Sequence, residues 1–128
     1  MKVFCTALIV LILASCTPQT QVTTPIAALE KGENHMVNTD LNLIAFPRSV
    51  IYISEGKGQK TTLEFASPIQ IQTVFNFFDM QFTGDGWNRE NVSYIERLNK
   101  YEGTYTRRGE RLKVSLKLEN NRYRLETQ

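Results

Sequence analysis

The sequence predicts an α+β domain, in which one helix packs on one face of an antiparallel sheet of about five or six strands. Three observations predict this fold. Residues 50–65 contain two segments rich in β-branched and alternating apolar residues, which flank a glycine-containing turn. Residues 71–82 repeat apolar side chains every three or four positions, as an amphipathic helix does. Residues 101–125 contain alternating segments separated by turn residues, so we expect the order strand, strand, helix and then a meander of three or four strands.

The first two strands are expected to form a hairpin. Residues 50–53 are Val, Ile, Tyr and Ile, and the turn at 55–58 closes this first strand. In residues 61–65 apolar and polar side chains alternate, which places Leu63 and Phe65 together on one side. That side of the hairpin is expected to face the core.

The helix is expected to begin at Ser67 and Pro68, because serine is a favoured N-cap and proline is tolerated at the first helical position. Glycine at 84 and 86 is expected to end it, since glycine readily adopts the left-handed conformation of a C-cap. The buried stripe of this helix consists of Ile71, Val74, Phe75, Phe78 and Phe82.

Three further apolar residues of this segment lie partly off the stripe, namely Ile69, Phe77 and Met80. They either broaden the core face of the helix under a curved sheet or form an exposed patch for a partner or lipid.

The remaining strands follow the helix. Residues 87–94 form a predicted strand opened by Trp87, and residues 95–100 form a loop or a helical turn. Strands at 101–107, at 112–118 and around Tyr123 and Leu125 complete the meander. The turn at 120–121 is Asn-Asn, which adopts the positive φ of a tight hairpin.

A short apolar run behind Lys2 ends in Leu13-Ala14-Ser15-Cys16. The run is too short to span a bilayer as a helix, and it lacks the polar positions of an amphipathic core helix. This segment resembles the signal peptide of bacterial lipoproteins, with these four residues as the lipobox. An ordinary secretory signal peptide and a buried helix are the alternatives.

The resemblance to lipoproteins implies a location. Residues 1–15 would be removed, and a lipid on Cys16 would hold the protein on a membrane of the bacterial cell envelope, facing the periplasm or the cell exterior. In some Gram-negative bacteria, an aspartate directly after the lipidated cysteine resembles an inner-membrane retention signal. The residue at that position here is Thr17. The outer membrane is therefore favoured if the host has one.

The rest of the chain divides into two regions by composition. Residues 16–42 are rich in Thr, Gln, Pro and Asn without sustained periodicity, so we expect a lipidated N-terminus and a flexible tether. Residues 26–29 are its only apolar patch, either disordered or a short amphipathic turn. His35, the one histidine of the chain, is expected in a solvated loop. Residues 43–128 are expected to form a single small α+β domain.

The predicted domain also resembles small, largely uncharacterised bacterial envelope domains. The residues that carry this resemblance are Phe46-Pro47, Val74-Phe75, Phe77-Phe78 and Gly86-Trp87. The resemblance implies a fold and carries no catalytic residue to this chain.

Charge is unevenly distributed along the chain. Residues 17–95 hold five Lys or Arg against eight Asp or Glu, whereas residues 96–128 hold nine against five. The candidate binding residues are Lys113, Lys117, Arg122 and Arg124 on the sheet face, together with Arg107, Arg108 and Arg111 at the hairpin end. This basic sheet face is expected to contact an envelope protein or an anionic surface, whereas nucleic acid is excluded outside the cytoplasm. A solvated face that discourages pairing between sheet edges is the alternative.

The sequence contains few features of an enzyme active site. Residues 43–128 contain no histidine, no nucleophile elbow and no phosphate-binding loop. Asp79, Asp85 and Glu90 match no calcium-loop spacing and are expected to be surface carboxylates. We therefore expect no catalytic residue, no metal site and no cofactor.

The sequence thus predicts a membrane-anchored, non-enzymatic binding or accessory module of the cell envelope. The alternative is a carrier of a lipid or another hydrophobic ligand. Its cavity would lie between helix and sheet, with Phe75, Phe78 and Trp87 near the mouth.

Overall fold

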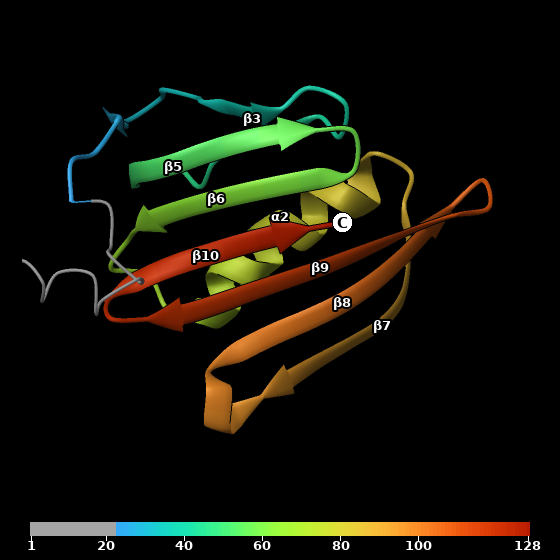
Figure 1. Ribbon diagram of the computed structural model, residues 1–128. Coiled ribbons are helices and arrows are strands. Elements are labelled where there is room, and N and C mark those ends of the chain that lie inside the picture. Colours follow the sequence, from blue (N-terminus) through green and yellow to red (C-terminus); the bar gives the residue numbers. More distant parts are fainter. Residues whose placement is uncertain (1–22) are drawn as a thin grey trace, which may run out of the picture.

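The computed structural model describes residues 23–128. They form an α+β fold in which one helix, α2 (Ile71–Gly84), packs on one face of a seven-stranded antiparallel sheet (Figure 1). The strand order is β2-β5-β6-β10-β9-β8-β7. Its strands are β2 (Ala27–Ala28), β5 (Val50–Lys57), β6 (Lys60–Ala66), β7 (Asn88–Ile95), β8 (Lys100–Arg107), β9 (Glu110–Glu119) and β10 (Arg122–Thr127).

The α+β class is confirmed, but the predicted number of strands and the order of elements are wrong. The main sheet has seven strands, and a second sheet pairs β3 (Met36–Asn38) with β4 (Leu43–Ile44). Five strands of the described chain therefore precede the helix, instead of two. The three additional strands are two or three residues long, and so short a segment shows no alternation in sequence.

The segment expected to be a flexible tether is also ordered over much of its length. Ala27 and Ala28 pair with β5, and Val37 is buried in the core. The Asn38 side-chain amide donates to the backbone oxygens of Gly58 and Lys60, so it fastens β3 to the β5–β6 turn. The prediction fails here because these short strands gain their stability from covering the edge of β5, which composition does not reveal. The lipobox and Cys16 lie outside the described residues.

His35 is not a free loop residue. Its Nε2 lies 3.0 Å from Oγ of Ser54 on β5, and its side chain is half-buried. The contact connects the N-terminal segment to the main sheet.

The core lies between α2 and the sheet. Val74, Phe75, Phe78 and Phe82 of the predicted stripe are buried, and Ile71 is half-buried. Aromatic rings fill the layer: the Phe65 and Phe78 rings have their centroids 6.0 Å apart, the Phe65 and Tyr123 rings 5.2 Å, and the Phe82 and Tyr105 rings 5.3 Å.

The off-stripe residues of the helix divide into two kinds. Phe77 packs edge-on against Phe46, with ring centroids 5.2 Å apart, and so broadens the core face. Ile69 and Met80 are 40% and 70% exposed.

The helix begins later than predicted, at Ile71 with Gln70 as its N-cap residue. Ser67 instead accepts a 3.2 Å hydrogen bond from the Ile69 backbone N–H in the turn before the helix. The predicted glycine at the C-terminal end of the helix is confirmed, since Gly86 has φ +94°. The predicted hairpin turn at Asn120-Asn121 is confirmed as well, since both residues have positive φ.

Candidate functional site

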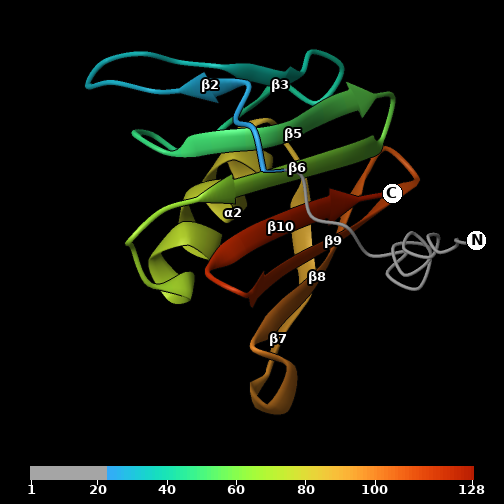
Figure 2. The same cartoon turned by 60° about the vertical axis from the view of Figure 1, so that its left-hand side comes forward.

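The face of the sheet opposite α2 is polar and carries a groove of about 850 Å³. Figure 1 views the sheet with the helix behind it, and Figure 2 shows the twist of the strands from another side. The alternation of each strand creates this surface, because buried Leu63, Leu116 and Leu125 face the helix and their neighbours in sequence face outward. We call this surface the open face.

A row of carboxylates and hydroxyls crosses five strands in the middle of the groove. Successive cross-strand partners form it: Glu55, Thr62, Glu126, Ser115 and Glu102. We call these five residues the acidic row. It brings together residues from β5, β6, β10, β9 and β8 that are far apart in sequence.

Cations flank the acidic row on both sides. Arg124, Lys117 and Lys100 are consecutive partners on β10, β9 and β8, and we call them the paired basic row. On the other side, Lys57 lies opposite Lys60, and Lys113 lies two positions before Ser115 on β9. All three line the groove and are exposed. We call Lys57, Lys60 and Lys113 the lysine end.

Four of the predicted binding residues lie on the open face, namely Lys113, Lys117, Arg122 and Arg124. Three of these four cations are paired with carboxylates. Lys117 lies 3.3 Å from Glu119, Arg122 lies 3.6 Å from Glu64, and Arg124 lies 3.0 Å from Glu126. The open face is therefore a surface of alternating charge, in which most of the cations of the expected basic face are paired.

The other three predicted residues do not join this group. The Arg107 side chain lies on the helix side, where its guanidinium stacks 4.3 Å from the centre of the Trp87 ring and pairs with Asp85 at 3.1 Å. Arg108 occupies a tight turn with φ +52°, and Arg111 pairs with Glu90 at 3.4 Å. Arg107 is separated from the cations of the open face because the alternation of β8 places it on the same side as buried Tyr105.

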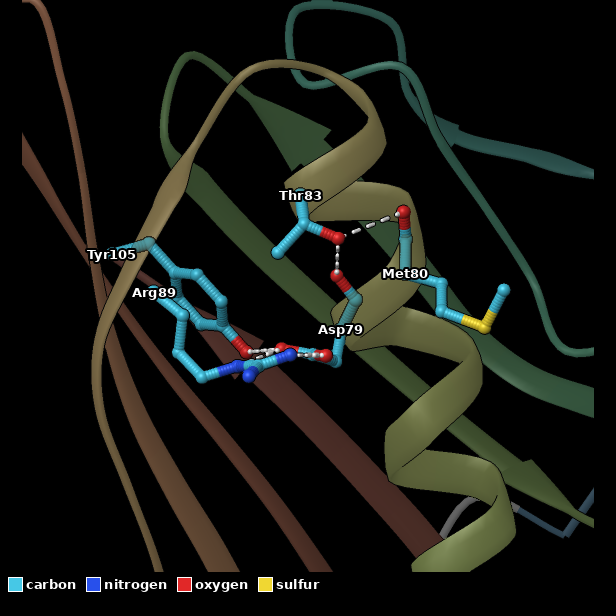
Figure 3. Close-up of polar contacts among 5 residues, drawn as sticks. All are labelled: Asp79, Met80, Thr83, Arg89 and Tyr105. Carbon is cyan, nitrogen blue, oxygen red and sulfur yellow. Dashed lines mark hydrogen bonds and ion pairs between the residues drawn. The ribbon is translucent and has the colours of Figure 1, made fainter.

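A second polar cluster lies on the helix side (Figure 3). Asp79 of α2 meets Arg89 of β7 and Tyr105 of β8. The Tyr105 hydroxyl donates to Asp79 Oδ1 at 2.7 Å, and Arg89 Nε donates to the same oxygen at 3.0 Å. Arg89 Nη2 pairs with Asp79 Oδ2, so both carboxylate oxygens have partners.

The environment of the cluster shifts three pKa values, and the hydrogen bond to Asp79 raises that of the Arg89 guanidinium. Burial acts to raise the pKa of Asp79, but the hydrogen bonds from Arg89 and Tyr105 and the positive charge of Arg89 outweigh it, so the pKa is lowered. Burial, together with the neighbouring Asp79 carboxylate, raises the pKa of the Tyr105 hydroxyl. The cluster therefore holds an ionised aspartate and a neutral tyrosine.

This cluster is a structural connection and not a binding site. Tyr105 is fully buried and Asp79 is 7% exposed. Asp79 is thus not the surface carboxylate that the sequence predicted, because the phenol and the guanidinium stabilise its charge inside the fold. Asp79, Asp85 and Glu90 each pair with a different arginine, and among residues 23–128 no three metal-ligating side chains converge.

The sequence predicts the groove residues of β9 and β10 but not those of β5 and β6. The alternation of β9 and β10 places Ser115 and Glu126 on the same outer face as the predicted cations. By contrast, Glu55, Lys57 and Lys60 reach the groove because β6 pairs with β10, a contact between residues about sixty positions apart.

The sequence matches no protein-family model, no curated protein and no solved structure. Within residues 23–128, no helix has both the length and the apolar character needed to cross a membrane.

Proposed function

We propose that this protein is a membrane-anchored, non-enzymatic binding module of the bacterial cell envelope and that it holds its ligand on the open face of the sheet. The observation that carries the proposal is the groove of about 850 Å³, a volume typical of ligand sites. Charged and hydroxyl side chains from five strands line it, and they suit a polar ligand. The lipobox resemblance supports the anchor at Cys16.

The mechanism is colocalisation. A lipid anchor confines the domain near the membrane and so raises the local concentration of the groove for ligands in the envelope. The sheet supplies a rigid surface, since its other face is packed against α2. Binding therefore needs no rearrangement of the core.

The alternative, a carrier of a hydrophobic ligand, has less support. It needs space between helix and sheet, where aromatic rings are packed against one another. Phe75, Phe78 and Trp87, which were expected near the mouth of such a cavity, are at most 3% exposed.

A bulky substitution in the groove tests the proposal. Ser115 lies in the acidic row between Glu126 and Glu102, and Ser115→Trp would fill the groove with an indole ring while keeping a residue that favours strands. Ser93 of β7 lies opposite Glu102 and does not line the groove, so Ser93→Trp is a matched control on the same face.

Full-length lipidated protein would be isolated from gently solubilised envelopes, and the proteins and small molecules that co-purify would be identified by mass spectrometry. We expect the wild-type protein and Ser93→Trp to retain the same ligand and Ser115→Trp to lose it. Equal retention by all three would show that the open face does not bind.

A further inference from the structure

Ion pairing divides the cations of the open face into two groups. Four of them lie within 4 Å of a carboxylate, namely Lys100, Lys117, Arg122 and Arg124. The three lysines of the lysine end make no ion pair with any residue from 23 to 128. The unpaired positive charges are therefore gathered at one end of the groove.

The arrangement of the lysine end is unfavourable without a ligand. Lys57 and Lys60 are direct cross-strand partners, and like charges in such positions repel each other. Two carboxylates nearby, Glu55 in the groove and Asp40, which accepts a hydrogen bond from the Gly58 backbone N–H, make no ion pair within the described residues. The three lysines thus outnumber these two carboxylates, and the lysine end keeps a net positive charge.

The strand pairing fixes the spacing of these lysines. The backbone of Lys113 exchanges hydrogen bonds of 2.8 and 2.9 Å with Gln128, which follows β10, and β10 pairs with β6 on its other side. Lys113 and Lys60 thus flank one strand, which separates their backbones by roughly 10 Å. Lys57 lies one strand farther along the same line.

We propose that the lysine end binds a soluble ligand carrying two or more phosphate groups that span about 10 Å. This inference rests on the proposed function and names the ligand class of the same groove. Lysine ammonium groups bind phosphate as point charges, and a local cluster of unpaired positive charges attracts anions. The hydroxyls of Thr62 and Thr104, which line the groove, are additional donors.

The hollow shape of the site favours a soluble ligand over a bilayer surface. A flat array of lipid headgroups contacts the rim of a groove, whereas an elongated molecule enters it. Phosphate groups of the ligand would replace the missing partners of the three ammonium groups.

The test uses full-length lipidated protein in neutral detergent micelles and a short linear polyphosphate as the probe. Binding would be measured by calorimetry for the wild-type protein and for the triple variant Lys57→Gln, Lys60→Gln, Lys113→Gln. The matched control removes three charges from the paired basic row, by Lys100→Gln, Lys117→Gln and Arg124→Gln.

We expect the lysine-end variant to bind polyphosphate at least about tenfold more weakly, since a single charge-assisted contact accounts for roughly that factor. The control should stay within about threefold of the wild-type protein, because its cations are already paired. Equal losses in both variants would mean non-specific attraction to positive charge and would overturn the proposal, as would no binding by the wild-type protein.

Labelling of lysines with an amine-reactive reagent separates the soluble ligand from the membrane. Polyphosphate should protect Lys57, Lys60 and Lys113 but not Lys31, which is exposed elsewhere. Protection in phosphatidylglycerol vesicles but not in phosphatidylcholine vesicles, without protection by polyphosphate, would assign the lysines to the anionic bilayer and refute the proposal.

This inference and the proposed function can fail separately. If the lysine-end variant keeps the envelope ligand that Ser115→Trp loses, the inference is wrong and the binding groove remains. If Ser115→Trp also keeps that ligand, the proposed function itself is wrong.

Discussion

The Tyr105 hydroxyl donates a 2.7 Å hydrogen bond to the Asp79 carboxylate in the layer between helix and sheet. Tyr105 lies on β8 and Asp79 on α2, so this contact connects the two layers of the fold at the end of the helix (Figure 3). Arg89 on the edge strand β7 completes the connection. The positions of β7 and β8 against the helix therefore depend on one buried carboxylate.

Substitution of Asp79 should lower stability more than substitution of either partner. Asp79→Asn would weaken the contacts with both Arg89 and Tyr105 at a buried position. We expect the free energy of unfolding to fall by about 2 kcal/mol. This value allows for the half-exposed Arg89, whose ion pair is screened by solvent. Tyr105→Phe removes one hydrogen bond and should cost about 1 kcal/mol. Urea unfolding followed by circular dichroism measures both values.

A double-mutant cycle checks that the two residues act together. We expect a coupling energy above roughly 0.5 kcal/mol between Asp79→Asn and Tyr105→Phe, since they share one hydrogen bond. Additive effects would mean that the contact contributes nothing to stability.

Stability should depend on pH in the acid range through Asp79. Its pKa in the folded protein is below the ordinary value of 3.8. A group with a lowered folded pKa stabilises the fold above its unfolded pKa and loses this contribution as the pH falls toward the folded pKa. The difference in unfolding free energy between the wild-type protein and Asp79→Asn should therefore be constant from pH 7 to about pH 5 and shrink below about pH 4.

The alkaline range tests the other partner of the pair. The pKa of Tyr105 is raised above its ordinary value of 10.0, so the unfolded chain releases this proton more readily than the folded protein does. The contribution of Tyr105 to the free energy of unfolding is therefore present below pH 10 and is lost as the pH rises above 10. Tyr105→Phe should remove this part of the alkaline loss in urea titrations, whereas an unchanged alkaline profile would contradict the raised pKa.

The two sides of α2 should respond very differently to the same substitution. Phe78 is fully buried against Phe65 and Phe77, and Phe78→Ala should lower the free energy of unfolding by about 3–5 kcal/mol. Met80 is 70% exposed on the same helix, and Met80→Ala should change it by less than about 0.5 kcal/mol. Thermal unfolding distinguishes these outcomes, and a large effect at Met80 would indicate a contact on the exposed side of the helix.

The helix and the long strands could be predicted from sequence because their signals are local. The apolar spacing from Ile71 to Phe82 and the alternation of β9 need no knowledge of their partners. The pairing of β6 with β10 and the short strands β2, β3 and β4 depend on contacts between distant segments. For the same reason the sequence indicated Lys113 as a binding residue but missed Lys57 and Lys60, which join it only in the folded sheet.

The packing of β3 on β5 makes a further prediction at Gly56. A Cβ atom at this position would lie 2.5 Å from the Asn38 Cβ and 2.5 Å from the Val37 backbone oxygen, so the chain of β3 would have to move. We expect Gly56→Ala to lower the free energy of unfolding by about 2 kcal/mol, as other overpacking substitutions do. Faster hydrogen exchange should be seen in residues 36–44.

Gly84 provides the matched control for the same substitution. It lies in the last turn of α2, and a Cβ atom there would meet no other atom within 4 Å. Gly84→Ala should raise the free energy of unfolding by about 0.5 kcal/mol, because alanine restricts the unfolded chain. If the two substitutions changed stability by equal amounts, β3 would not pack on β5 as closely as the structure places it, and the N-terminal segment would not be part of the fold.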